Sequence, residues 1–224
     1  MPKKNKKDII IGNNNNKTTL IFCHGLGDSP TSWIYFSNFI KKYIKDIKVI
    51  LLCAENNPVT VNNGFIMPCW FDMLEIPIST KTKNSEKYIQ DSLNKIDEII
   101  NKEIQNNVSL NNIFLGGFSQ GAALSFIYLQ YKKQYLGGIL MLSGWMLNYE
   151  TLQVLKKINN KIPIFIGHGT SDDVVLYENA FYLNKLLNEN RFPNITFKSY
   201  DKMKHNISNK EIYDIIDWMN NLIK

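Results

Sequence analysis

The chain has 224 residues and a formal net charge of +6; 44% of its residues are hydrophobic and 21% are charged. This length suits one α/β domain with a buried core. No apolar run approaches the roughly 20 residues of a membrane-spanning helix, which excludes an integral membrane protein with such a span. We therefore expect a single domain that is soluble or peripheral to a membrane.

The basic charge is concentrated at the N-terminus, where lysine occupies positions 3, 4, 6 and 7. The other lysines are scattered, which favours a solvated tail over a nucleic-acid-binding surface and allows at most a transient contact with an anionic membrane. Because residues 1–17 are polar and end near an asparagine run, we predict a flexible extension there and a folded domain over 18–224. The N-terminus lacks the apolar core of a secretory signal, so the expected location is the cytoplasm.

From residue 18 onward, short β-rich apolar runs alternate with segments of helical period, which predicts an α/β fold with a mostly parallel sheet and helices on both faces. The predicted strands are 19–23, 48–53, 112–116, 138–143, 162–167 and 195–200. The predicted helices are 31–44, a long amphipathic one after Ser85, 120–130, 176–187 and 210–223.

Residues 55–83 interrupt this alternation. The segment combines several prolines and Gly64 with aromatic residues and methionines. We predict an extended loop, and a loop of this length inside a compact domain is usually functional.

The three cysteines, Cys23, Cys53 and Cys69, do not have metal-ligand spacing, and two of them lie in apolar runs. Buried, reduced thiols are therefore predicted. We expect no disulfide, no metal site and no cofactor.

The strongest chemical signal is Gly117-Phe118-Ser119-Gln120-Gly121, which follows a predicted strand and precedes a predicted helix. It fits the pattern G-x-S-x-G, in which a strained turn presents the serine above the sheet as a nucleophile. A serine that only caps the helix is the alternative reading. The strand-turn-helix context favours a serine hydrolase with Ser119 as the nucleophile.

A serine hydroxyl needs a base, and the base needs an acid to orient it. In this type of fold the acid and then the histidine follow the serine in the chain, which excludes His24. His205 fits this order better than His168, because two acids, Asp172 and Asp173, lie between Ser119 and His205. We favour Asp172 as the acid; Asp173 and Asp201 are the alternatives.

Acyl transfer also needs donors for the developing oxyanion. One is expected from the backbone N–H of Gln120, the residue after the nucleophile. The loop His24-Gly25-Leu26-Gly27-Asp28 follows an early strand, and its glycines allow a second N–H, that of Leu26, to turn toward Ser119. An ordinary glycine turn before a helix is the alternative.

These motifs together resemble the acyl-protein thioesterase family, also called the phospholipase/carboxylesterase family of α/β-hydrolases. The resemblance covers roughly residues 18–223. The matching motifs are His24 to Ser29, Asn57 to Thr60, Met67 to Asp72, Gly116 to Gly121, Leu142 to Trp145, His168-Gly169 before Asp172, and Met203 to His205. The resemblance implies the α/β-hydrolase fold, Ser119, Asp172 and His205 as the catalytic triad, and the Leu26 and Gln120 amides as the oxyanion hole.

The resemblance also implies a function: removal of S-linked palmitoyl groups from cytosolic proteins through an acyl-enzyme. It implies an apolar acyl channel near Phe65, Ile66, Met67, Trp70, Phe71 and Trp145. The implied partners are S-acylated proteins or lysophospholipid-like molecules, and a monomer or weak homodimer is expected. The alternatives are a lysophospholipase or short-chain carboxylesterase with the same triad, and an inactive lipid-binding protein of the same fold.

Overall fold

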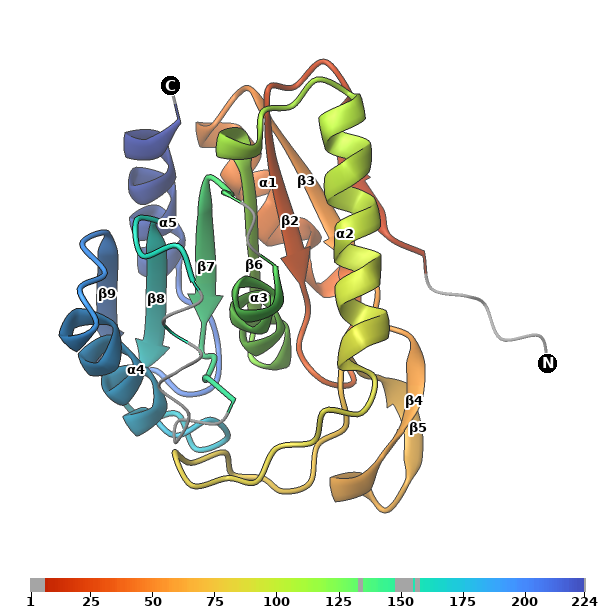
Figure 1. Cartoon of the computed structure of the whole chain (residues 1–224), viewed down its shortest axis with the longest axis vertical. Coiled ribbons are helices and arrows are strands. Elements are labelled where there is room, and N and C mark those ends of the chain that lie inside the picture. The colour runs from red at the N-terminus through yellow and green to blue at the C-terminus, as the bar shows by residue number, and fades with distance from the viewer. Residues whose placement is uncertain (1–6, 133–134, 148–154, 156–157, 224) are drawn as a thin grey trace.

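The centre of the molecule is a seven-stranded β-sheet (Figure 1). The computed structural model describes residues 7–132, 135–147, 155 and 158–223. The strand order is β1-β3-β2-β6-β7-β8-β9, in which β1 is antiparallel to β3 and all other pairs are parallel. The strands are Ile9–Ile11 (β1), Thr18–Cys23 (β2), Ile47–Leu52 (β3), Ile113–Phe118 (β6), Gly138–Leu142 (β7), Ile164–Gly169 (β8) and Ile195–Tyr200 (β9). The predicted parallel sheet is confirmed.

Helices cover both faces of the sheet (Figure 1). The helices are Ile34–Tyr43 (α1), Ile89–Gln105 (α2), Gln120–Tyr131 (α3), Glu178–Glu189 (α4) and Asn209–Leu222 (α5). One core lies between the sheet and α2, α3 and α4, and a second lies between the sheet and α1 and α5. In the predicted apolar stripe of α2, Leu93, Ile96 and Ile100 are fully buried, as helical spacing predicts, whereas Ile104 near the end of the helix is 41% exposed. Among the described residues, no helix is both long and apolar enough to cross a membrane.

The segment 55–83 is not loop throughout. It contains a two-stranded antiparallel hairpin, Asn56–Val59 (β4) and Phe65–Pro68 (β5). Its turn places Asn63 and Gly64 at φ values of 56° and 76°, a left-handed conformation that asparagine and glycine tolerate better than other residues. This Asn-Gly pair is a hairpin signal that the prediction of an extended loop overlooked.

The N-terminal segment is ordered further than predicted. A flexible extension was expected through residue 17, whereas Ile9–Ile11 form β1 and pair with β3. The Asp8 carboxylate also accepts the backbone N–H of Cys53 at 2.8 Å and lies 2.9 Å from Lys95 Nζ. Three consecutive isoleucines bring β-branched, apolar surface to the edge of the sheet, which outweighs the polar composition around them. The lysines at positions 3, 4 and 6 lie outside the described residues.

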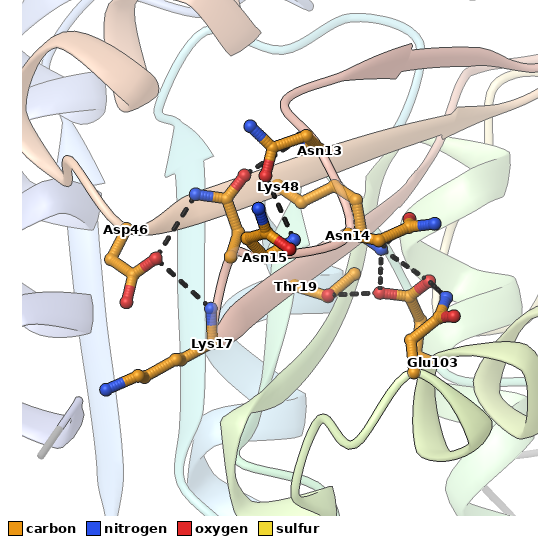
Figure 2. Close-up of polar contacts among 10 residues, drawn as sticks. Asn13, Asn14, Asn15, Lys17, Thr19, Asp46, Lys48 and Glu103 are labelled. Atoms are coloured by element: carbon orange, nitrogen blue, oxygen red, sulfur yellow. Dashed lines mark hydrogen bonds and ion pairs between the residues drawn. The ribbon is translucent and has the colours of Figure 1, made fainter.

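A buried ion pair lies where β2 and β3 begin, at the edge of the sheet opposite the carboxyl ends of its parallel strands (Figure 2). Lys48 Nζ is 2.6 Å from Glu103 Oε2, and the two side chains are 1% and 4% exposed. Thr19 Oγ1 donates to the same carboxylate, and Asn14 Oδ1 accepts from Lys48 at 3.2 Å. These extra hydrogen bonds offset the cost of removing two charges from water. Asn14 of the asparagine run is therefore part of a structural ion-pair network.

All three cysteines lie in the interior. Cys23, Cys53 and Cys69 are each less than 5% exposed, as the sequence predicted. Burial raises the pKa of the Cys69 thiol to about 11 and also raises the pKa of Cys23.

Candidate active site

Ser119 occupies a sharp turn between β6 and α3. Its φ is 54° and its ψ is −118°, a conformation that costs a residue with a side chain on the order of 1–3 kcal/mol. The turn is tight, because a Cβ on Gly121 would collide with the carbonyl oxygen of Cys23 and a Cβ on Gly117 would collide with the backbone of Gly121. The Ser119 N–H donates to the Leu142 carbonyl oxygen at 2.8 Å. The serine, 8% exposed, is thus held in a strained position at the carboxyl end of the sheet.

Asp172 and His205 come together from two loops at the same end of the sheet. Asp172 follows β8, His205 lies between β9 and α5, and His205 Nδ1 is 2.8 Å from Asp172 Oδ2. The other carboxylate oxygen, Oδ1, accepts the backbone N–H groups of Val174 and Val175 at 3.0 and 2.9 Å. An aspartate fixed in this way orients the imidazole and leaves its Nε2 available to take a proton from another group.

The two alternative acids lie elsewhere. The Asp173 side chain is 69% exposed and its carboxylate is 3.9 Å from Lys204 Nζ. Asp201 is exposed at the end of β9. The structure therefore brings Asp172 to His205, and neither Asp173 nor Asp201.

A second histidine, His168, contacts the same carboxylate from inside the protein. It is fully buried, and its Nε2 is 2.8 Å from the Val175 carbonyl oxygen and 3.2 Å from Asp172 Oδ2. Because both neighbours are acceptors, Nε2 carries the proton. His168 thus links the Asp172 carboxylate to the backbone of Val175. Sequence reasoning rejected His168 as the base and missed this supporting role; the available signal was its place at the end of a strand, four residues before Asp172.

The electrostatic environment keeps Asp172 ionised. Burial by itself raises the pKa of this carboxyl group. Hydrogen bonds from His168 and His205, the charge of His205 and the Val175 N–H together outweigh burial, so the pKa of Asp172 lies well below its ordinary value.

The loop after β2 lies against Ser119. A Cβ on Gly25 would stand 3.5 Å from the Ser119 Cβ, and Leu26 lines the same cavity as Ser119 and Gln120. Gln120 opens α3, where the first backbone N–H groups have no acceptor within the helix. The two residues predicted to supply oxyanion donors therefore border the cavity that holds the serine.

His24, which was excluded as a base, fixes this loop. Its Nε2 accepts the Ala54 backbone N–H at 3.1 Å, so Nδ1 carries the proton and donates to the Gly25 carbonyl oxygen at 2.7 Å. The indole N–H of Trp70 donates to the His24 carbonyl oxygen at 2.8 Å. The sequence offered no signal for this role beyond the position of His24 at the start of the glycine loop.

The cavity beside Ser119 has a volume of about 220 Å³ and is mainly apolar. Its apolar wall consists of Met73, Ile76, Ile78, Trp145, Val174 and Val175. A β-bridge joins Ile78 to Val175, with the Ile78 N–H donating to the Val174 carbonyl oxygen at 2.8 Å. The segment 55–83 and the loop that carries Asp172 therefore form one wall. Of these six residues, only Trp145 was predicted, because the bridge pairs residues far apart in the sequence.

Two of the other residues predicted for an acyl channel belong to the core. Trp70 and Phe71 are each 1% exposed. The Gln120 side chain holds both, since its Oε1 accepts the Trp70 N–H at 3.0 Å and its Nε2 donates to the Phe71 carbonyl oxygen at 2.7 Å. Neither lines the cavity beside Ser119, so their described role is to support the site.

The remaining three predicted channel residues lie on the hairpin. Phe65 and Ile66 are 70% and 59% exposed on β5, and Met67 packs beside the glycine loop, 3.5 Å from where a Cβ on Gly27 would stand. None of the three lines the cavity. All three belong to the β4–β5 hairpin, whose pairing the sequence analysis did not predict.

Residues 4–223 match the phospholipase/carboxylesterase family. Acyl-protein thioesterase 1 of Cryptococcus neoformans is 35% identical over 220 residues, which is 92% of each chain. Carboxylesterase SOBER1 of Arabidopsis thaliana is 32% identical over 212 residues, which cover 93% of this chain and 92% of SOBER1.

Solved structures agree. The crystal structure of Arabidopsis thaliana SOBER1 superposes with a TM-score of 0.84 at 32% identity and covers 92% of this chain and 99% of that one. The crystal structure of Zea mays acyl-protein thioesterase 2 gives a TM-score of 0.77 at 25% identity and covers 96% and 98% of the two chains. The fold is thus that of the α/β-hydrolases. The chain belongs to the phospholipase/carboxylesterase family, and it is a hydrolase.

Proposed function

We propose that this protein hydrolyses acyl thioesters on protein cysteines, with Ser119 as the nucleophile. The observation that carries the proposal is the 2.8 Å contact from Asp172 to His205, at a cavity that His205 shares with the strained serine. An ionised carboxylate bonded to His205 Nδ1 holds the imidazole in the tautomer whose Nε2 accepts a serine proton. The relatives named acyl-protein thioesterase 1 support a thioester substrate.

In the proposed reaction, Ser119 Oγ attacks the acyl carbonyl carbon while His205 Nε2 takes the serine proton. The backbone N–H groups of Leu26 and Gln120 stabilise the charge that develops on the carbonyl oxygen. The carbon–sulfur bond then breaks, and His205 returns the proton to the leaving sulfur, which yields a free thiol and an acyl-enzyme. Water attacks the acyl-enzyme with His205 again as base, which releases the carboxylic acid and restores Ser119.

The size of the apolar cavity supports a second candidate function. At about 220 Å³ it lies below the roughly 300–1,000 Å³ of sites that enclose drug-sized ligands. It therefore suits the carbonyl end of an acyl chain better than a whole palmitoyl group. This favours a short-chain carboxylesterase as the alternative, while a lysophospholipase would use the same three residues.

An acyl-length series separates these candidates. With a constant leaving group, each methylene that enters the cavity contributes about 0.8 kcal/mol, so kcat/KM should rise up to about fourfold per methylene. A rise that continues to the hexadecanoyl substrate supports palmitoyl removal. A maximum at a short chain supports the carboxylesterase instead.

A fluorophosphonate probe tests the nucleophile directly. The wild-type protein should be labelled on Ser119, and Ser119→Ala should abolish both labelling and hydrolysis. Ser109→Ala is the matched control, because Ser109 is an exposed serine before a short helix. If Ser119 stays unlabelled in folded protein, the enzymatic proposal fails and an inactive lipid-binding protein becomes the better explanation.

We place the protein in the cytoplasm as a monomer or weak homodimer, acting on S-acylated proteins with transient contact to anionic membranes through its lysine-rich N-terminus. Vesicle co-sedimentation at low and high salt measures that contact. Binding that is independent of anionic lipid would contradict an electrostatic attraction.

A further inference from the structure

A second cavity borders His205, and we propose that it binds the leaving group of the substrate, the peptide segment around the acylated cysteine. This inference rests on the proposed function. The second cavity has a volume of about 340 Å³ and lies between α1 and the start of α5. The cavity beside Ser119 is called the acyl cavity from here on. The second cavity shares Asp28, Phe118 and His205 with it, whereas Ser119 lines only the acyl cavity.

The chemistry of thioester cleavage requires two spaces that meet at His205. The carbonyl carbon attacked by Ser119 carries the acyl chain on one side and the sulfur on the other. When the carbon–sulfur bond breaks, the sulfur takes the proton held on His205 Nε2, so the sulfur must lie next to that nitrogen. With the acyl chain in the cavity that contains Ser119, the cavity on the other side of the imidazole is the one the leaving group can enter.

The rings of Phe118 and His205 line both cavities. The Phe118 ring stacks at an angle on His205, with centroids 4.7 Å apart, and it contacts Trp33 at 5.3 Å. Trp33 is fixed in turn, because its indole N–H donates to Asp28 Oδ2 at 2.9 Å. A substrate that occupies both cavities would therefore pass beside the Phe118 and His205 rings.

The lining favours a neutral or cationic peptide over an anionic headgroup. The floor is apolar, with buried Phe36 and Ile212 and partly exposed Ile207. The rim carries the exposed ring of Tyr35 and the amide side chains of Asn206 and Asn209, which can donate to and accept from a peptide backbone.

The charge of the lining residues further limits which substrates this cavity can bind. Among the described residues that line this cavity, Asp28 is the only carboxylate and none is a lysine or arginine. A phosphate group would therefore find no cation there, whereas phosphate sites typically supply one. We infer that apolar side chains next to the acylated cysteine enter this cavity.

Matched thioesters test this inference. Three substrates carry the same octanoyl group: a cysteine peptide flanked by leucines, the same peptide flanked by aspartates, and cysteamine, which has no peptide. For the wild-type protein, kcat/KM should be about tenfold higher for the leucine peptide than for the aspartate peptide, as expected for burial of one apolar side chain. An acyl glycerophosphate should be a poorer substrate than the leucine peptide.

A substitution at Tyr35 tests whether this cavity causes the preference for the leucine peptide. Tyr35→Ala should lower the ratio of kcat/KM for the leucine peptide to that for octanoyl cysteamine by about three- to tenfold. Phe181→Ala is the matched control, because Phe181 is an aromatic residue of similar exposure on α4, at 56% against 64% for Tyr35. Phe181→Ala should leave the ratio unchanged.

The outcomes separate this inference from the function on which it rests. If the wild-type protein hydrolyses octanoyl cysteamine but does not distinguish the two peptides, or if Tyr35→Ala leaves the ratio unchanged, the leaving-group site is refuted and the hydrolase remains. Faster turnover of the acyl glycerophosphate than of the leucine peptide also refutes it. If no thioester or ester is hydrolysed and Ser119 is not labelled, the proposed function itself fails.

Discussion

Replacing His168 by leucine tests whether this buried histidine positions Asp172. The substitution removes a donor that lies 3.2 Å from Asp172 Oδ2 and 2.8 Å from the Val175 carbonyl oxygen, at a site with no solvent exposure. A hydrogen bond to a charged group contributes about 1.5–3 kcal/mol, and for a protein of this size each kcal/mol corresponds to roughly 2–4 °C in Tm. We therefore expect Tm to fall by roughly 3–12 °C.

The kinetic effect should be larger than the loss of stability alone explains. If Asp172 is displaced by about 1 Å, the His205 imidazole is misaligned and the rate can fall by about a hundredfold. The assay is the rate of fluorophosphonate labelling of Ser119, measured well below the Tm of every variant. His168→Gln, whose amide places an N–H near the position of Nε2, should recover much of the rate.

Lys48→Met is the matched control for this experiment. It breaks a buried ion pair at the opposite edge of the sheet, so it should cost about 3–5 kcal/mol of stability and leave the labelling rate of the folded protein unchanged. A His168→Leu protein that labels as fast as the wild type would refute the positioning role. So would an equal loss of rate in Lys48→Met.

Three further predictions concern other parts of the chain. Glu211 is 1% exposed, and burial raises its pKa to about 8 against the lowering effect of the Ser208 backbone N–H. Between about pH 5 and 8 the native state keeps this proton and the unfolded state does not, so the stabilising contribution present at low pH is lost as pH rises. Denaturant titrations should show that the free energy of unfolding of Glu211→Gln rises relative to that of the wild type by up to about 1.4 kcal/mol per pH unit. A difference that stays constant with pH would contradict this. Gly121→Ala should lower the free energy of unfolding by at least about 2 kcal/mol and abolish labelling of Ser119, because the new Cβ meets the Cys23 carbonyl oxygen. A variant with the Tm and the labelling rate of the wild type would contradict this. Ile76→Trp, at a 44% exposed position on the acyl cavity, should lower kcat/KM for octanoyl esters more than for acetyl esters, and equal effects on both would argue against an acyl site there.

Much of the fold could be predicted because its signals are local. The runs that became β2 and β6 are apolar almost throughout, as strands covered on both faces must be. The strand β1 was missed because three residues form a strand only when an edge such as β3 is available. The hairpin was missed because each of its strands has only four residues and both strands contain a proline.

The candidate site could be predicted only in part. Ser119 and His205 follow from a motif and from chain order, and both rest on the chemistry that a hydroxyl nucleophile requires. The walls of the acyl cavity do not follow, because the bridge between Ile78 and Val175 joins residues 97 positions apart. The role of His168 was also hidden, since a contact between two side chains four residues apart depends on how the loop after β8 folds.

The buried cysteines have a consequence for an enzyme that handles thioesters. A thiolate near an acyl-enzyme competes with water for the acyl group, and the competition depends on thiolate exposure. Here Cys23, Cys53 and Cys69 are withdrawn from solvent, and burial raises the pKa of Cys23 and Cys69. The chain therefore presents no exposed thiol of its own that could compete with water for an acyl group.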